Sequence, residues 1–153
     1  LKKMIMDYLD ECKLMTIATV NGNKPWAATV WYVHGKDFSL YFLSRRGRRH
    51  SLELKNNPNA AGTITKPHMK GSGEKVRGLQ FEGIAKEASG KTLRRAQKLY
   101  LAKCPKAQKI PVERLEDPKF IATFYVVRPR IFVLFDEVNF PDAPRQELRL
   151  QVS

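Results

Sequence analysis

The sequence predicts a mainly β protein whose strands form one closed or partly closed antiparallel barrel with a few helices. Short runs rich in β-branched and aromatic residues recur along the chain, and turn signals containing Gly, Asn or Pro separate them. Only a few stretches show helical periodicity. Many short strands with few helices favour a barrel over a parallel α/β sheet. The pattern leaves open whether the barrel is an oligonucleotide-binding Greek key, a lipocalin-like cup or another type.

A short helix and three strands are predicted at the start of the chain. Apolar residues at three- and four-residue intervals give the helix one apolar stripe that packs on a sheet: Leu1, Met4, Ile5, Tyr8, Leu9 and Cys12. Residues 14–20 are rich in β-branched side chains, and a tight-turn signal at 21–23 connects them to a second strand at 26–33. A turn at 34–37 leads to a third strand at 39–43, so we expect an antiparallel meander.

The middle of the chain continues this pattern. A short helix is expected at 51–56 and a fourth strand at 60–65. Residues 76–86 predict a longer strand, in which Gly78 and Gly83 mark bulges or a close approach of two backbones.

A second amphipathic helix and a last hairpin complete the barrel. Residues 90–104 carry apolar side chains on one helical face and basic side chains on the other. Residues 120–127 and 131–138 flank a turn at Arg128-Pro129, which predicts a hairpin and about seven strands in all.

The junction after the third predicted strand has the composition of an anion site. Ser44 and Gly47 interrupt the apolar pattern among four arginines within five residues: Arg45, Arg46, Arg48 and Arg49. Guanidinium groups bind phosphate bidentately, and the first N–H groups of the following helix could face the same anion. The alternative interpretation is a solvated basic turn or a nucleic-acid contact.

Composition limits the kinds of protein that this chain could be. Its 153 residues, 42% of them hydrophobic, fit one domain, which we assign to residues 1–140 with a C-terminal tail at 141–153. The net charge of +13 favours anionic partners. Cys12 and Cys104 lack the spacing of a zinc site, so no metal is expected. No run is apolar enough to span a membrane and no secretory signal is visible, which predicts a cytoplasmic protein.

The order of these segments resembles the pyridoxamine 5′-phosphate oxidase-like, FMN-binding split-barrel superfamily. The resemblance covers most of the chain: a helix, LMTIATVNGNKPWAATVWYV, YFLS with its basic turn, LKNNP, AAGTI and RGLQFEGIAK. Within the superfamily the chain is most similar to the YhbP-like group, through Trp26, the pair Arg49-His50 and VRGLQFEG. The resemblance implies a split β-barrel of antiparallel Greek-key type. It also implies a homodimer with two FMN molecules in grooves at the subunit interface, and the C-terminal tail could contact the partner.

The resemblance assigns a set of cofactor-binding positions. Ser44 matches a position that contacts the flavin or its phosphate, and Arg49 and His50 match the basic positions of the phosphate turn, to which Arg48 could add. His50 stands where the family often has Lys, so its charge near pH 7 depends on the phosphate. The remaining positions lie beside the isoalloxazine ring or flank its groove: Trp26, Ala27, Ala28, Thr29 and Gln80. Each of these residues could instead serve packing alone.

The function expected from the resemblance is a flavin-dependent oxidoreductase that transfers hydride through FMN. Its small-molecule redox substrate is open, with NAD(P)H as one candidate donor, and no side chain stands out as a catalytic acid or base. The substrate-phosphate residues of true pyridoxamine phosphate oxidases are not recognisable, so vitamin B6 oxidation is not expected.

Two alternative functions remain. Related split barrels bind haem or a deazaflavin, and a haem protein would need an axial ligand, for which His50 is the histidine near the proposed groove. A basic nucleic-acid-binding barrel is permitted by the charge. It is not expected as the function, because the aromatic residues are not interleaved with the basic ones.

Overall fold

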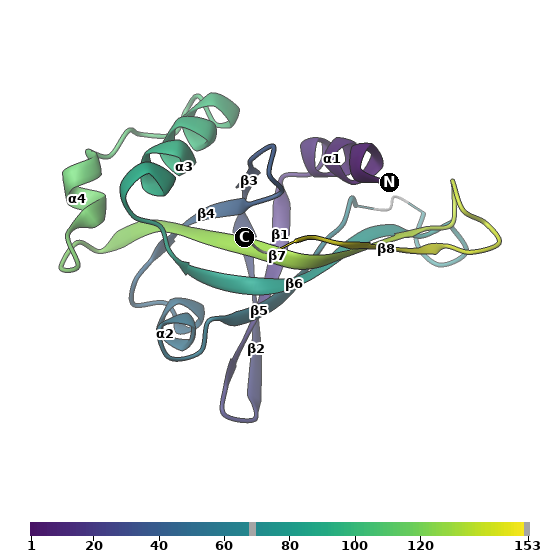
Figure 1. Ribbon diagram of the computed structural model, residues 1–153, viewed down its shortest axis with the longest axis horizontal. Coiled ribbons are helices and arrows are strands. Elements are labelled where there is room, and N and C mark those ends of the chain that lie inside the picture. The colour runs from purple at the N-terminus through teal and green to yellow at the C-terminus, as the bar shows by residue number, and fades with distance from the viewer. Residues whose placement is uncertain (68–69, 152–153) are drawn as a thin grey trace.

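The computed structural model describes residues 1–67 and 70–151 and consists of one strongly curled antiparallel sheet with helices around it (Figure 1). The sheet order is β2-β1-β5-β6-β7-β4-β3, and β8 pairs with β7. The strands are β1 (Leu14–Asn21), β2 (Lys24–Trp31), β3 (Val33–His34), β4 (Leu40–Arg45), β5 (Asn59–Ile64), β6 (Arg77–Glu87), β7 (Ala122–Asp136) and β8 (Arg145–Arg149). The helices are α1 (Lys2–Glu11), α2 (Arg49–Asn56), α3 (Gly90–Lys103) and α4 (Val112–Glu116). This architecture confirms the predicted split-barrel fold class.

Two apolar clusters hold the elements together. The larger one fills the barrel under α1 and includes Ile5, Leu9, Met15, Ile17, Phe42 and Leu134. The smaller one lies under α3 and α4 and includes Leu93, Ala96, Leu115, Phe124 and Val126. Helices α1 and α3 therefore present to the barrel the apolar stripe that their sequence periodicity predicts.

The first hairpin is confirmed, but the predicted three-stranded meander is wrong. β2 pairs with β1 and ends at Trp31, and the chain then turns at Tyr32 so that β3 pairs with β4 instead. Tyr32 is buried, and its hydroxyl donates to the carbonyl of Leu9 at 2.7 Å. This bend leaves β2 unpaired on one side and opens the barrel between β2 and β4.

The predicted last hairpin is also wrong, because β7 runs unbroken through Arg128-Pro129. Gly83 pairs with Pro129 and Glu82 pairs with Ile131, so one residue of β7 is left over at a bulge. Proline is tolerated there because a bulge removes the need for its missing N–H. A Cβ on Gly83 would lie 2.2 Å from the carbonyl oxygen of Arg128, which confirms the close backbone approach predicted for this glycine.

Three further features were not predicted. α4 follows α3, α2 begins two residues earlier than expected, and the segment assigned to a tail forms β8 along the second half of β7. Periodicity is weak in five-residue elements, which explains why both α4 and β8 were missed. Within the described ranges no helix has the length and apolar character needed to cross a bilayer.

Candidate functional site

A Ser–His pair links the end of β4 to the start of α2. The Oγ of Ser44 and the Nε2 of His50 lie 2.7 Å apart and share a hydrogen bond, whose direction depends on the tautomer of His50. The imidazole is buried, and its centroid is 6.1 Å from that of the Phe42 ring. The pair therefore fixes the turn between strand and helix.

The electrostatic surroundings make His50 sensitive to a nearby anion. Burial and the positive charge of Arg48 lower the pKa of His50, while the carboxylate of Glu53 acts in the opposite direction. The imidazole is therefore mainly neutral near pH 7. An anion bound at the turn would offset the charge of Arg48 and raise the pKa of His50.

The N-terminus of α2 supplies uncapped backbone donors. Arg48 occupies the N-cap position with an extended backbone, and no side chain of the described residues caps the helix. The first N–H groups of a helix have no carbonyl partner within it, and the helix dipole makes this end positive. No acidic residue lies in the first turn of α2. This end of the helix fits an anionic group such as a phosphate.

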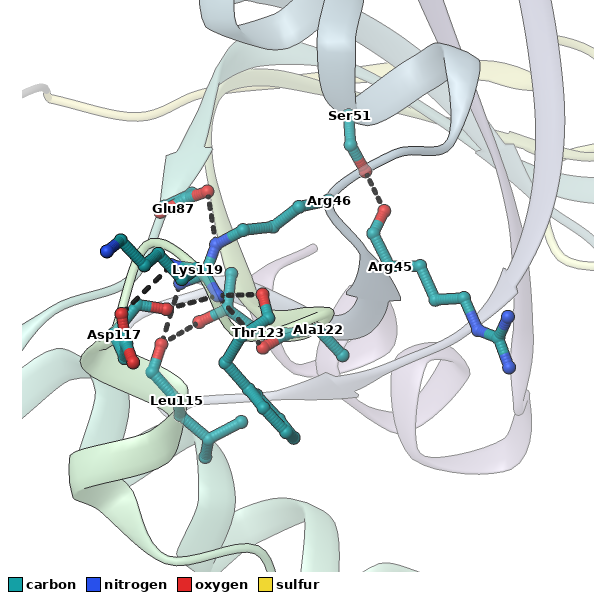
Figure 2. A network of polar contacts seen from close by, with 10 residues as sticks. Arg45, Arg46, Ser51, Glu87, Leu115, Asp117, Lys119, Ala122 and Thr123 are labelled. Carbon is teal, nitrogen blue, oxygen red and sulfur yellow. Dashed lines mark hydrogen bonds and ion pairs between the residues drawn. The ribbon is translucent and has the colours of Figure 1, made fainter.

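The four arginines of the turn have different roles. Figure 2 shows that the side chain of Arg46 points into a network away from the helix N-terminus, whereas that of Arg45 points elsewhere. Arg46 donates from Nε to Glu87 at 3.0 Å and from its amino groups to the carbonyls of Leu115, Asp117, Phe120 and Ala122. Arg46 therefore ties the segment after α4 to the barrel, and Arg45, Arg48 and Arg49 remain available to an anion.

Arg49 is oriented by two neighbours and is still open to a ligand. Its Nε donates to Oε1 of Glu53 at 3.2 Å, and its guanidinium carbon lies 4.2 Å from the centroid of the Trp26 ring. Across the described part of the chain, neither terminal amino group of Arg49 has a hydrogen-bond partner, and the side chain is 46% exposed. The outer edge of the guanidinium is thus free to bind a phosphate bidentately.

Glu53 is a site residue that the sequence prediction missed. Its side chain is only 6% exposed, and its second oxygen, Oε2, is buried without a hydrogen-bond partner. The signal was present in the sequence, because Glu53 follows Arg49 by four residues on one helix face.

Three of the other predicted residues fall on the outer face of the open sheet: Ala27, Thr29 and Gln80. Partners in adjacent strands point to the same face, and the register forms a polar row of Thr29, Thr16, Thr63 and Gln80. A second row consists of small side chains: Ala27, Ala18 and Ala61. Most of these residues line a shallow hollow of about 610 Å³, together with side chains of β7 and β8.

The predicted residues therefore form two groups. Ser44, Arg48, Arg49 and His50 lie together at the turn, with Trp26 stacked on Arg49. Ala27, Thr29 and Gln80 share the outer face, whereas Ala28 faces inward and packs against the barrel core. β2 lies close to β4 without pairing with it, so the two groups flank the split in the barrel.

Among the described residues no cluster of His, Cys, Asp and Glu has the geometry of a metal site. His34 links α1 to β3, because its Nε2 lies 2.8 Å from Oδ1 of Asp10 and shares a hydrogen bond with it.

Comparisons with known proteins agree with this fold. The family model described as pyridoxamine 5′-phosphate oxidase matches residues 1–122. A UPF0306 protein of Pasteurella multocida is 29% identical over 99 residues, which cover 64% of this chain and 65% of that protein. A UPF0306 protein of Photorhabdus laumondii is 28% identical over 118 residues, with 74% and 80% covered. The YhbP-like proteins correspond to this UPF0306 group, so the predicted subgroup fits.

One solved structure with the same fold belongs to a protein that is named for binding haem, and not FMN. A haem-binding protein from Mycobacterium smegmatis matches with a TM-score of 0.72 and 17% identity, over 92% of this chain and 54% of that chain. At this identity the match shows a shared fold, and the ligand has to be argued from the residues of the site.

Proposed function

Because the chain belongs to the pyridoxamine 5′-phosphate oxidase-like superfamily, we propose that it binds FMN and acts as a flavin-dependent oxidoreductase. The proposal assigns the flavin phosphate to the turn between β4 and α2. It assigns the ring to the split of the barrel, beside β2.

The observation that carries the proposal is the α2 N-terminus. Uncapped N–H groups lie there next to the exposed side chain of Arg48 and that of Arg49, which has a free edge. Ser44 adds a hydroxyl and His50 adds a group that can take up a proton when an anion binds. A phosphate monoester offers the charge and the several acceptor oxygens that such a set of donors requires.

The sheet beside the turn suits a flat ring. Ala27 and Ala18 have small side chains, which leave room for a ring on the outer face of the sheet. Thr29 and Gln80 provide polar groups on the same face. Trp26 lies on the opposite, barrel-facing side of β2 and borders the phosphate turn through its contact with Arg49. We assign these residues to ring binding and orientation.

A homodimer is part of the proposal. β2 is unpaired on one side, and Trp31 and Leu14, which are partners across β1 and β2, are 56% and 41% exposed. An exposed edge strand beside large apolar side chains favours association, and a second copy would cover the ring site. Analytical ultracentrifugation of the wild-type chain and of the Trp31→Glu variant tests this, with a dimer expected for the first and a monomer for the second. A monomeric wild type contradicts it.

When bound, FMN would supply the hydride chemistry, while the chain supplies binding, orientation and the local field. Among the described residues that line the hollow beside Arg49, Glu53 is the one carboxylate, and Lys24 and Arg49 are the cations. The exposed cations Arg48 and Arg49 would hold the phosphate of FMN. The redox substrate belongs to the class of small molecules that fit the shallow outer hollow, with NAD(P)H as a candidate donor.

Haem is the competing ligand, because a neighbour of the same fold is named for it. An axial ligand would have to be released from existing contacts. His50 is buried with its Nε2 bonded to Ser44, and His34 is bonded to Asp10, while His68 lies outside the described residues. FMN is therefore the better fit to the described histidines.

An absorption spectrum of the purified protein, before and after incubation with FMN and with haemin, tests the proposed ligand. The expected result is a flavin spectrum, with FMN retained through gel filtration. A Soret band after haemin treatment, together with loss of FMN on the column, contradicts the proposal.

A further inference from the structure

The charge of this protein is concentrated in one segment that the flavin site does not use. Residues 88–112 contain seven Lys and Arg and no Asp or Glu, so they supply seven of the thirteen net positive charges. This segment includes α3 and the start of α4, which lie on the far side of the sheet from α2 (Figure 1).

The cations of α3 form a single stripe. Lys91, Arg94, Arg95 and Lys98 follow the i, i+3, i+4, i+7 pattern of one helical face, and all four are exposed. The opposite face is buried against the barrel through Leu93 and Ala96. The stripe is therefore held rigidly on the surface by the packing of the other face.

This arrangement lowers the stability of the helix. Like charges at i, i+3 and i, i+4 repel each other, and cations near the N-terminus oppose the helix dipole. Within the described ranges Lys91, Arg94 and Lys98 have no acidic partner, and only Arg95 has one, Asp37 at 3.3 Å. Among the described residues Asp37 is the one acidic partner of the stripe, so a polyanionic partner would offset the repulsion that remains.

The stripe continues into a basic hollow. Asp37, the partner of Arg95, lines a hollow of about 640 Å³ beside the turn before β4. Lys2, Lys36 and Arg128 line the same hollow and are exposed. Arg95 thus joins α3 to a second group of cations, and the basic surface is longer than the helix alone.

We propose that the α3 stripe, Lys91, Arg94, Arg95 and Lys98, with the adjoining hollow, binds the phosphate backbone of a nucleic acid. A regular row of exposed cations on a rigid helix matches a regularly charged polymer. Recognition of the backbone needs no stacked bases, so the lack of aromatic residues interleaved with the cations does not oppose it. The binding is independent of sequence.

An anionic membrane is the less suitable partner. Helices that bind to bilayers insert an apolar face, but the apolar face of α3 is buried in the protein. None of the large exposed hydrophobic side chains of the described chain lies on α3: they are Leu1, Leu14, Trp26, Trp31, Leu52, Val76, Ile121 and Val138.

The test is a titration of a short labelled DNA duplex of random sequence with the full chain at several salt concentrations. The wild-type protein should bind at low salt, with log K against log salt falling with a slope of about −3, as expected when about three phosphates are neutralised. The triple variant K91Q/R94Q/K98Q should bind at least about tenfold more weakly at low salt and with a shallower slope.

A matched variant removes the same charge elsewhere. Lys13, Lys75 and Lys119 are exposed and lie outside α3, and K13Q/K75Q/K119Q should keep most of the wild-type affinity. Failure of the wild type to bind at low salt overturns the proposal, and so does an equal loss in the two triple variants. Binding to phosphatidylglycerol vesicles without binding to the duplex also overturns it. Retained thermal stability of both variants confirms that folded proteins are being compared.

Discussion

The guanidinium carbon of Arg49 lies 4.2 Å from the centroid of the Trp26 ring, so the phosphate turn and the second strand meet at this pair. Trp26 is 43% exposed, and the contact covers one face of its ring. The indole lies on the same side of β2 as Ala28, the side that faces the barrel, and it points toward the turn and α2. The pair joins the two groups of residues assigned to the phosphate and to the ring.

Replacing Trp26 should therefore loosen Arg49. W26L should weaken FMN binding about two- to fivefold, since an exposed cation–π contact contributes ~0.5–1 kcal/mol. W26F retains an aromatic face and should lose less than W26L. Fluorescence titration with FMN measures both variants, and equal losses would show that the ring face has no part in binding.

Glu53 should act on the phosphate through Arg49. E53L removes the acceptor of the Arg49 Nε–H, whereas E53Q keeps an acceptor, and both remove the negative charge. FMN binding should be about tenfold weaker in E53L than in E53Q, as expected for loss of one hydrogen bond to a charged group.

Riboflavin distinguishes this positioning role from a packing defect at Glu53. Because riboflavin lacks the phosphate, its affinity should be equal in E53L and E53Q, and isothermal titration calorimetry measures both ligands. A parallel loss of riboflavin binding in E53L would assign the effect to packing.

Arg46 should contribute to stability, in contrast to its exposed neighbour. R46M removes a largely buried guanidinium that donates to Glu87 and to several backbone carbonyls, of which those of Leu115 and Asp117 keep another donor. The free energy of unfolding should fall by ~2–4 kcal/mol. R45M at an exposed position should change it by less than ~0.5 kcal/mol. Urea denaturation compares them, and similar values for the two variants would contradict the structural role of Arg46.

His50 should make the unliganded protein less stable in mild acid. Its pKa is lowered in the folded state by burial and by Arg48, so the unfolded chain binds the proton more tightly. The contribution of neutral His50 to stability is therefore fully present above the pKa of about 6.5 in the unfolded chain. It is lost as the pH falls from there through the pKa in the folded state. Thermal unfolding between pH 8 and pH 5 should show a smaller decrease in Tm for H50Q than for the wild type. An identical decrease would show that another group is responsible.

The sequence predicted most strands and the basic turn, because these depend on local signals. Turn residues at 21–23 and the apolar periodicity of α1 and α3 are properties of neighbouring residues. The resemblance then placed Ser44 and His50 in one site, although it could not show that they are bonded to each other.

Pairing between distant strands was beyond local signals. Arg128-Pro129 has the composition of a turn, yet it lies inside β7. The strand continues through it because the bulge next to Gly83 accommodates a residue that has no N–H to donate. The polar row from Thr29 to Gln80 depends on the register of four strands, which no single segment encodes. The role of Arg46 depends on carbonyls about seventy residues further along the chain.

The most direct test of the phosphate site is the ratio of FMN to riboflavin affinity in the wild type and in R49A/H50A. The wild type should prefer FMN by at least about tenfold, because only FMN carries the group that the turn binds. In R49A/H50A, folded by circular dichroism, the preference should disappear and FMN should be released. Full retention of the preference in the double variant would show that the phosphate is anchored elsewhere.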